Sequence, residues 1–111
     1  EQVIGRTKLD DIEMDDELKP STAHIARVVI EEDGKELEIL RHSMPYGHLG
    51  EMGLMFASYA RSAKPFTRML EMMFLRDGEG HYDHLLDYSR PVSGASLFAP
   101  SIDFLKRMAG R

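Results

Sequence analysis

The chain has 111 residues, enough for one domain with a single modest core. Its formal net charge of −5 argues against a surface that binds nucleic acid or an anionic membrane. The absence of cysteine excludes disulfides, thiolate metal sites and thiol catalysis. No apolar run approaches the roughly 18 residues of a membrane span, and we expect a cytoplasmic protein.

The first 22 residues are polar and acidic. Six of the eight residues from 10 to 17 are Asp or Glu, and Pro20 follows them. Because like charges repel and few apolar side chains are available to bury, we expect residues 1–22 to form an extended or loop lead-in, followed by a single domain at 23–111. A calcium loop is the alternative, but the spacing does not match an EF-hand, which needs a Gly at its sixth position.

Residues 25–43 predict a β-hairpin. Two runs rich in Val, Ile and Leu, residues 25–31 and 37–43, flank Asp33-Gly34, a pair that tolerates the positive φ angles of a two-residue turn. Pairing of Glu32 with Lys35 across this turn sets the register of both strands. The register places three polar side chains on one otherwise apolar face: His24, Arg41 and Ser43.

A loop, a strand and a helix are expected after the hairpin. Three glycines and a proline mark residues 45–53 as a loop, and residues 54–60 alternate as a strand with Leu54 and Phe56 on one face. Apolar residues at 66, 69, 70, 73 and 74 predict a helix with one stripe facing the core. Ser62 is the expected N-cap of this helix, with Pro65 in its first turn.

The last part of the chain predicts a short helix at 81–88, a strand at 93–99 and a helix at 100–108. The whole order of elements predicts an α+β fold, in which helices cover one face of an antiparallel sheet. His81 and His84 lie one helical turn apart and form a weak zinc signal, because no complete set of ligands accompanies them.

Five stretches of the chain also carry a family resemblance. Residues 23–28, Ala-His-Ile-Ala-Arg-Val, and 39–47, Ile-Leu-Arg-His-Ser-Met-Pro-Tyr-Gly, resemble the haem-binding segment of the dye-decolorizing peroxidases, particularly the bacterial cytoplasmic branch. Residues 4–11, 53–59 and 85–94 look like the same family in the same order. The resemblance implies a ferredoxin-like fold, haem b as cofactor, and a peroxidase that reduces hydrogen peroxide and oxidises bulky aromatic donors such as dyes.

In that family pattern His24 is the ligand of the haem iron. A lone histidine at the entrance of a strand is structural in most proteins, so the role rests on the neighbouring motif residues. A carboxylate on the other ring nitrogen would set the ring orientation, and Asp87 is our expected partner, with Asp83 as the alternative. A proximal ligand and a distal arginine need a macrocycle between them, so we expect His24 to lie before the first strand, on a loop or a short helix.

The resemblance places Arg41 on the opposite, distal side of the haem. A fixed guanidinium there would stabilise the negative charge that develops as peroxide is cleaved. An exposed strand arginine that pairs with Glu38 or another carboxylate is the ordinary alternative. Ser43 would hold distal water or substrate, and Leu54 and Phe56 would form the apolar distal wall, although both would be core residues by pattern alone.

One family motif has no counterpart in this sequence. Members of the family are expected to be about twice this length, with two ferredoxin-like halves, and the first half carries a Gly-x-x-Asp-Gly motif that does not occur here. The chain therefore resembles a C-terminal half only. Two alternatives stay open: a catalytically inactive module that oligomerises through exposed surface, and a haem carrier without turnover. We expect self-association into a homo-oligomer.

Overall fold

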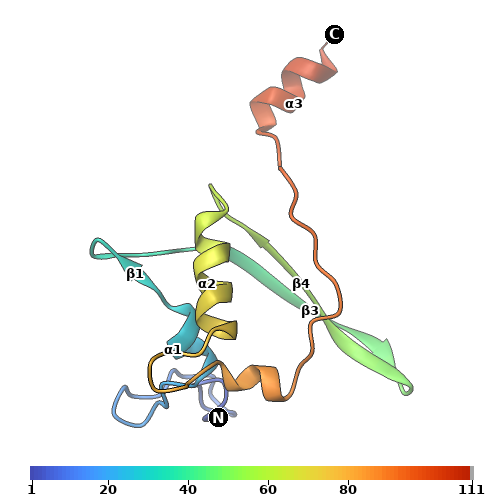
Figure 1. Ribbon diagram of the computed structural model, residues 1–111. Coiled ribbons are helices and arrows are strands. Elements are labelled where there is room, and N and C mark those ends of the chain that lie inside the picture. The colour runs from blue at the N-terminus through green and yellow to red at the C-terminus, as the bar shows by residue number, and fades with distance from the viewer. Residues whose placement is uncertain (111) are drawn as a thin grey trace.

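The computed structural model describes residues 1–110 and has an α+β fold (Figure 1). Its elements, in chain order, are α1 (His24–Val28), β1 (Glu31–Glu32), β2 (Lys35–Glu36), β3 (Leu40–His48), β4 (Glu51–Tyr59), α2 (Lys64–Phe74), the 3-10 helix η1 (His84–Asp87) and α3 (Ile102–Ala109). The strands form two antiparallel pairs, β1 with β2 and β3 with β4. The expected fold class, helices with antiparallel strands, is confirmed.

The first expected strand is wrong, because residues 24–28 form helix α1. The backbone N–H groups of His24 and Ile25 donate to the carbonyls of Val3 and Ile4, at 2.8 and 3.1 Å. Ile25 and Val28, one turn apart, are both buried. These tertiary contacts override the strand propensity of the Val- and Ile-rich run. The expectation that His24 lies on a short helix before the first strand is confirmed.

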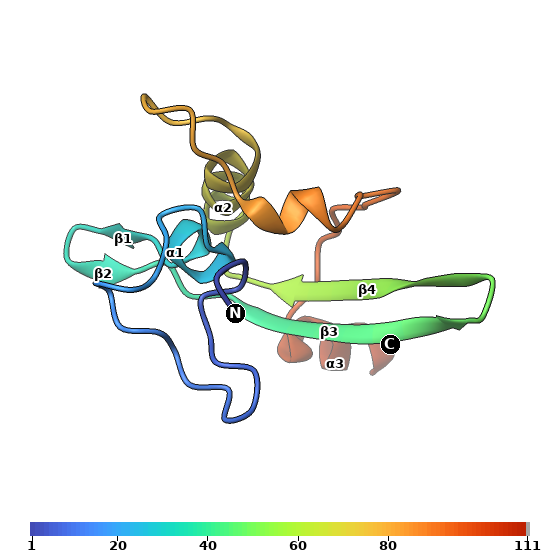
Figure 2. The same cartoon turned by 90° about the horizontal axis from the view of Figure 1, so that it is seen from below.

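The Asp33-Gly34 turn is confirmed, with φ angles of 52° and 72° at its two residues. Glu32 pairs with Lys35 as expected, and the Leu37 N–H donates to the Ile30 carbonyl at 2.8 Å. The hairpin therefore extends from residue 30 to residue 37 and no further. It is the small pair β1–β2 beside α1 in Figure 2.

A second, longer hairpin replaces the loop expected at 45–53. Strands β3 and β4 pair along their whole length around Leu49-Gly50, from Leu40 opposite Tyr59 to His48 opposite Glu51. Pro45 is tolerated because β3 has only one partner strand. Gly47 is required for the turn, since its φ is 130° and a Cβ there would collide with the carbonyl oxygen of Glu51.

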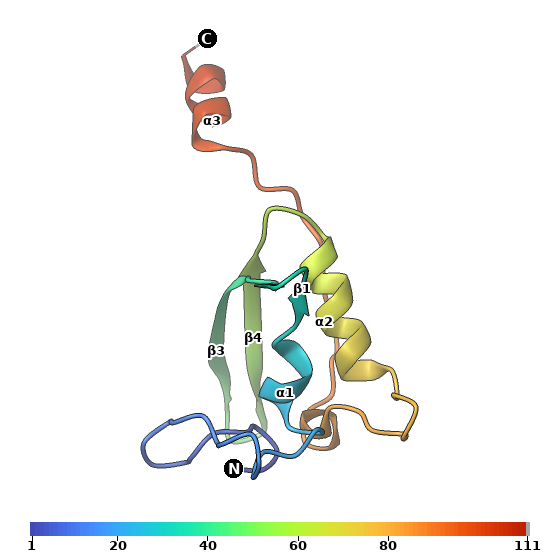
Figure 3. The ribbon, with the colours of Figure 1, turned by 90° about the vertical axis from the view of Figure 1, so that its left-hand side faces the viewer.

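Helix α2 begins close to its expected start, with Ala63 rather than Ser62 as N-cap and Pro65 in the first turn. Met69 is buried against Val28 and Ile30, and this cluster is the core. Met73 packs against this cluster, and the other residues of the expected core stripe border an open groove between α2 and the β3–β4 hairpin. Figure 3 shows α1 and α2 on one side of that hairpin.

Two expectations for the end of the chain are also corrected. The helix at 81–88 is only the 3-10 turn η1, and the strand expected at 93–99 does not form. The chain runs from η1 as an extended arm to α3, whose N-cap Ser101 accepts a hydrogen bond from the Phe104 N–H at 3.2 Å. Helix α3 stands apart from the other elements (Figures 1 and 3). Within residues 1–110, no helix is both long and apolar enough to span a membrane.

The arm makes the molecule less compact than its length would allow. Its radius of gyration is 17.1 Å, against roughly 13 Å for a compact domain of this size. Large apolar side chains stay exposed on the β3–β4 hairpin and on α3, including Leu54, Phe56, Leu105 and Met108. The buried core is correspondingly small and lies where α1 meets α2.

Candidate functional site

His24 is held by a buried carboxylate. Its Nδ1 lies 2.6 Å from Oδ2 of Asp83, whose side chain is 0% exposed. The second carboxylate oxygen, Oδ1, accepts the Leu85 N–H at 2.9 Å. Because an ionised carboxylate only accepts hydrogen bonds, this pairing places the proton of a neutral imidazole on Nδ1, and Nε2 of that tautomer carries the lone pair.

The expected partner Asp87 does not contact His24. Asp87 is exposed and accepts a hydrogen bond of 2.7 Å from the hydroxyl of Tyr82. That bond is the main reason why the pKa of Tyr82 lies above its ordinary value of 10.0. Our preference for Asp87 was wrong and the alternative, Asp83, is the partner, because the helix begins at His84 rather than at His81 and Asp83 is its N-cap.

An N-cap signal in the sequence points to this residue. Asp is favoured at N-caps because its side chain accepts the free N–H groups of the first turn, and Asp83 does so with the Leu85 N–H. The predicted helix began at His81, which made Asp83 an ordinary residue within the helix. A predicted start at His84 would have made Asp83 the N-cap, as it is in the structure.

The side chain of His24, which carries the free Nε2, borders the large groove between α2 and the β3–β4 hairpin. His24 is 25% exposed, and within residues 1–110 no hydrogen bond engages its Nε2. The groove is thus the place from which a ligand would reach this nitrogen.

The other expected site residues come from one face of the β3–β4 hairpin. In its register Arg41 lies opposite Ser58, Ser43 opposite Phe56, and Pro45 opposite Leu54, and such pairs share a face. Four of these side chains border the same groove as His24: Arg41, Ser43, Leu54 and Phe56. The structure therefore brings the expected residues together, with the exception of Asp87.

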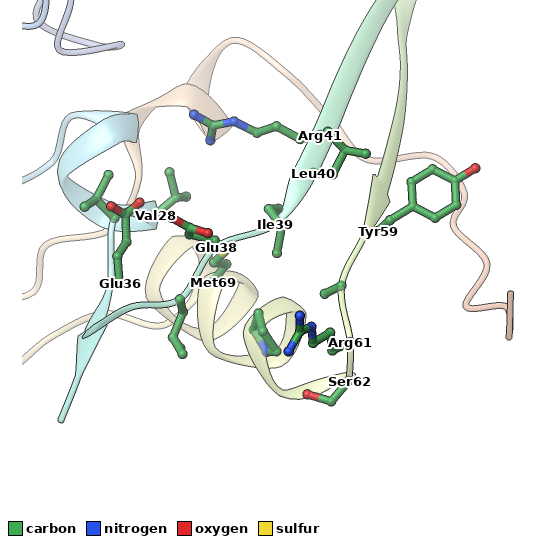
Figure 4. A pocket seen from close by; sticks show the side chains of 14 residues that line it. Val28, Glu36, Glu38, Ile39, Leu40, Arg41, Tyr59, Arg61, Ser62 and Met69 are labelled. Atoms are coloured by element: carbon green, nitrogen blue, oxygen red, sulfur yellow. The ribbon is translucent and has the colours of Figure 1, made fainter. Parts of the chain in front are cut away.

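Arg41 is exposed and is free for a ligand. Figure 4 shows its side chain extending to the opposite side of the hairpin from Tyr59. Within the described part of the chain no carboxylate forms an ion pair with Arg41, neither Glu38 nor another. A smaller cavity of about 930 Å³, also bordered by Arg41, adjoins the groove near Val28 and Met69.

The groove is much wider than a closed ligand pocket. It measures about 2680 Å³, whereas ligand pockets commonly enclose roughly 300–1,000 Å³. Its lining is mostly apolar, with α2 contributing Phe66, Met69, Leu70, Met73 and Phe74. A flat, apolar macrocycle with a metal centre fits this arrangement: the groove is bordered by an imidazole whose Nδ1 is bonded to a carboxylate, by an apolar wall and by a cation, and it has room to spare.

Sequence reasoning missed one buried polar residue near the site, Arg27. It follows His24 by one helical turn and is 5% exposed. The strand predicted for residues 25–31 gave no reason to single out Arg27. Helix α1 places Arg27 on its buried side, together with Val28.

The histidine pair considered for zinc does not form a metal site. Among residues 1–110, no group of three His, Cys, Asp or Glu side chains is arranged to hold a metal ion. His81 instead lies 3.5 Å from Asp77 and 3.4 Å from Glu79, measured from Nδ1 to the nearest carboxylate oxygen. The backbone N–H of His81 donates to Oδ1 of Asp77, and this bond is the main reason why the pKa of Asp77 lies below its ordinary value of 3.8.

Comparison with known proteins establishes the family of the chain. The sequence profile of a family described as "Dyp-type peroxidase, C-terminal" matches residues 1–104. The chain belongs to the Dyp-type peroxidase family. The dye-decolorizing peroxidase of Mycolicibacterium paratuberculosis is 52% identical over 108 residues, which are 95% of this chain and 30% of that protein.

Two solved structures are similar to this member of the Dyp-type family. A crystal structure of a Dyp-type peroxidase protein of Shewanella oneidensis superimposes with a TM-score of 0.87 at 50% identity, covering 96% of this chain and 35% of that one. A variant of DypB of Rhodococcus jostii in complex with haem gives a TM-score of 0.71 at 45% identity, covering 78% of this chain and 29% of that one. The chain spans about a third of the length of these relatives, so they are about three times as long, rather than twice as expected.

Proposed function

We propose that this chain is the haem-binding C-terminal part of a dye-decolorizing peroxidase that reduces hydrogen peroxide and oxidises bulky aromatic donors. The observation that carries the proposal is the His24–Asp83 pair at the edge of a groove that Arg41 also borders. Haem b, when bound, supplies the redox chemistry of the reaction.

His24 would bind the haem iron through Nε2. Metal-binding histidines commonly donate their other ring N–H to a carboxylate, which fixes the tautomer and raises the basicity of the ligand nitrogen. Asp83 is placed for that task, because it is fully buried and both of its oxygens are engaged. Asp83 thereby takes the role expected of Asp87.

Arg41 would act on peroxide from strand β3, which also borders the groove. Its guanidinium has no carboxylate partner among the described residues, so its full charge is available to stabilise the oxygen that becomes negative as the O–O bond breaks. Ser43 would hold water or substrate beside it, and Leu54 and Phe56 would form the apolar wall. The aspartate of the Gly-x-x-Asp-Gly motif would come from the part of the longer relatives that this chain does not match.

Titration of the purified chain with hemin, followed by its Soret band, tests the proposal. We expect a saturable shift in the wild type that His24→Ala abolishes. His42→Ala is the matched control, since His42 is an exposed histidine on β3 outside the groove. The absence of saturable binding in the wild type, or equal binding by wild type and His24→Ala, would overturn the assignment.

A second candidate function is a catalytically inactive module that oligomerises, with or without haem. The exposed apolar side chains of the β3–β4 hairpin and α3 favour it, because patches of this kind mark association surfaces. Light scattering after size exclusion, over a hundredfold range of concentration, tests self-association. A strictly monomeric mass throughout would count against a homo-oligomer.

Peroxide turnover by the hemin-loaded chain with an aromatic donor separates the peroxidase from a haem carrier. The cytoplasmic location stays a prediction.

A further inference from the structure

Arg27 joins three segments of the chain. Its Nε donates to the Met72 carbonyl at 2.8 Å, its Nη1 to Oδ2 of Asp77 at 3.1 Å, and its Nη2 to the carbonyls of Leu75 and His81 at 3.3 and 3.4 Å. The guanidinium thus ties α1 to the C-terminal end of α2 and to the loop that follows it. Only the planar fork of Arg can serve acceptors in so many directions at once.

The same loop ends at Asp83, whose backbone N–H and the N–H that follows it both donate to other segments of the chain. The Asp83 N–H donates to the Met73 carbonyl at 3.1 Å, and the following N–H, of His84, donates to the Thr22 carbonyl at 3.0 Å. Thr22 lies two residues before His24. The backbone of Asp83 is therefore clamped between the end of α2 and the start of α1.

The last carbonyls of α2 are the shared anchor. The last four carbonyls of a helix have no partner within the helix, so they accept from outside. The Met72 carbonyl accepts from Arg27, and the Met73 carbonyl accepts from Asp83. A shift of Arg27 relative to this helix end would move the loop from 75 to 83 and, with it, the carboxylate that meets His24.

We propose that Arg27 is a positioning residue that holds Asp83 in hydrogen-bonding distance of His24 and so keeps His24 in the Nδ1–H tautomer. The consequence for haem rests on the proposed function, since only that tautomer leaves Nε2 able to bind iron. The alternative is that Arg27 contributes to stability alone, like any buried residue of the core.

The test uses nitrogen NMR of the histidine side chains in the chain without hemin, at about pH 8, above the usual range of histidine titration. In the wild type we expect His24 in the Nδ1–H form. In Arg27→Lys the charge remains, but a single ammonium cannot serve four acceptors, and we expect a mixture of tautomers at His24. Val28→Ala changes a neighbouring residue that packs in the core with Ile30 and Met69, and it should keep the wild-type tautomer although it is less stable.

A second variant keeps the test decisive if Arg27→Lys does not fold. Asp77→Asn retains the oxygen that accepts from the His81 N–H and turns an amide NH₂ toward Arg27, so it should shift the His24 tautomer in the same direction and by less. A folded Arg27→Lys or Asp77→Asn with unchanged His24 signals, or an equal change in Val28→Ala, would overturn the proposal.

Hemin titration of the same variants separates the two proposals. Loss of a residue that supports a metal ligand commonly lowers affinity by 10- to 100-fold, and we expect about a 10-fold loss for Arg27→Lys. A changed tautomer in a protein that never bound hemin would leave the positioning role intact and refute haem binding. Specific hemin binding with an unchanged tautomer would refute the positioning role and leave haem binding intact.

Discussion

Replacing Asp83 by Asn tests the central pair of the site with almost no change of shape. Asp83 faces two donors, Nδ1–H of His24 and the N–H of Leu85. An Asn side chain offers one acceptor oxygen and one NH₂ donor, so it can satisfy only one of them. The Leu85 N–H cannot give up its proton, whereas a neutral imidazole can move its proton to the other nitrogen. We therefore expect Asp83→Asn to bond Leu85 and to turn His24 into the Nε2–H tautomer.

The expected magnitude follows from burial. Asp83 is 0% exposed, so no water replaces the lost bond, and a hydrogen bond to a charged group is worth about 1.5–3 kcal/mol. If about 2 kcal/mol is needed to return His24 to the form with a free Nε2, hemin affinity falls by roughly 30-fold, since each tenfold corresponds to about 1.4 kcal/mol. This lies within the 10- to 100-fold range typical for lost partners of metal ligands.

The assay is a hemin titration of wild type, Asp83→Asn and Asp87→Asn, with the tautomer of His24 read by nitrogen NMR in the absence of hemin. Asp87→Asn is the matched control, because it changes the same residue type in the same turn and loses only the contact with Tyr82. Equal affinities for wild type and Asp83→Asn, or an equal loss in Asp87→Asn, would refute the reasoning.

Three further predictions concern stability and are measured by chemical unfolding. Met69→Ala, in the core, should lower the free energy of unfolding by about 2–4 kcal/mol, whereas Met52→Ala, at a residue 80% exposed, should change it by less than about 0.5 kcal/mol; similar losses in both would contradict the assigned core. Gly5→Ala should be destabilising by about 1–3 kcal/mol, because φ is 87° and the new Cβ would collide with the Ile25 side chain, and a neutral effect would show that residues 3–5 do not pack on α1. The pKa of Asp77 is lowered in the folded state, so its contribution to stability is present above its unfolded pKa of 3.8 and is lost as the pH falls through the folded pKa. The free energy of unfolding between pH 5 and pH 2 should therefore depend less on pH in Asp77→Asn than in the wild type. Identical profiles would argue against the Asp77 contacts.

Signals within a few residues predicted several parts of the fold correctly. The positive φ tolerated by Asp33-Gly34 determined the first turn, and the spacing of apolar residues with Pro65 determined α2. A C-terminal helix was also correctly expected, though the structure starts it after Ser101. Each of these features depends on backbone geometry or capping inside one element, so no distant part of the chain is needed to read it.

Features that depend on distant partners were predicted poorly. Residues 25–31 have strand composition, yet residues 25–28 fold as part of α1, because Val3, Ile4 and α2 supply partners that no local pattern reveals. The stripe of α2 has the period of a core helix, but only Met69 is buried in the core, and Met73 packs against it while remaining partly exposed.

For the site, the sequence by itself singled out His24 and Arg41, through motifs that resemble a known family. It also supplied the expectation that a carboxylate accompanies His24. Only the tertiary structure decided between Asp83 and Asp87, and only it revealed Arg27, because a hydrogen bond across 59 residues of chain depends on where α2 ends and how the next loop returns to α1. Residue types and their spacing determine what a side chain can do, whereas its partner is determined by which segments meet in space.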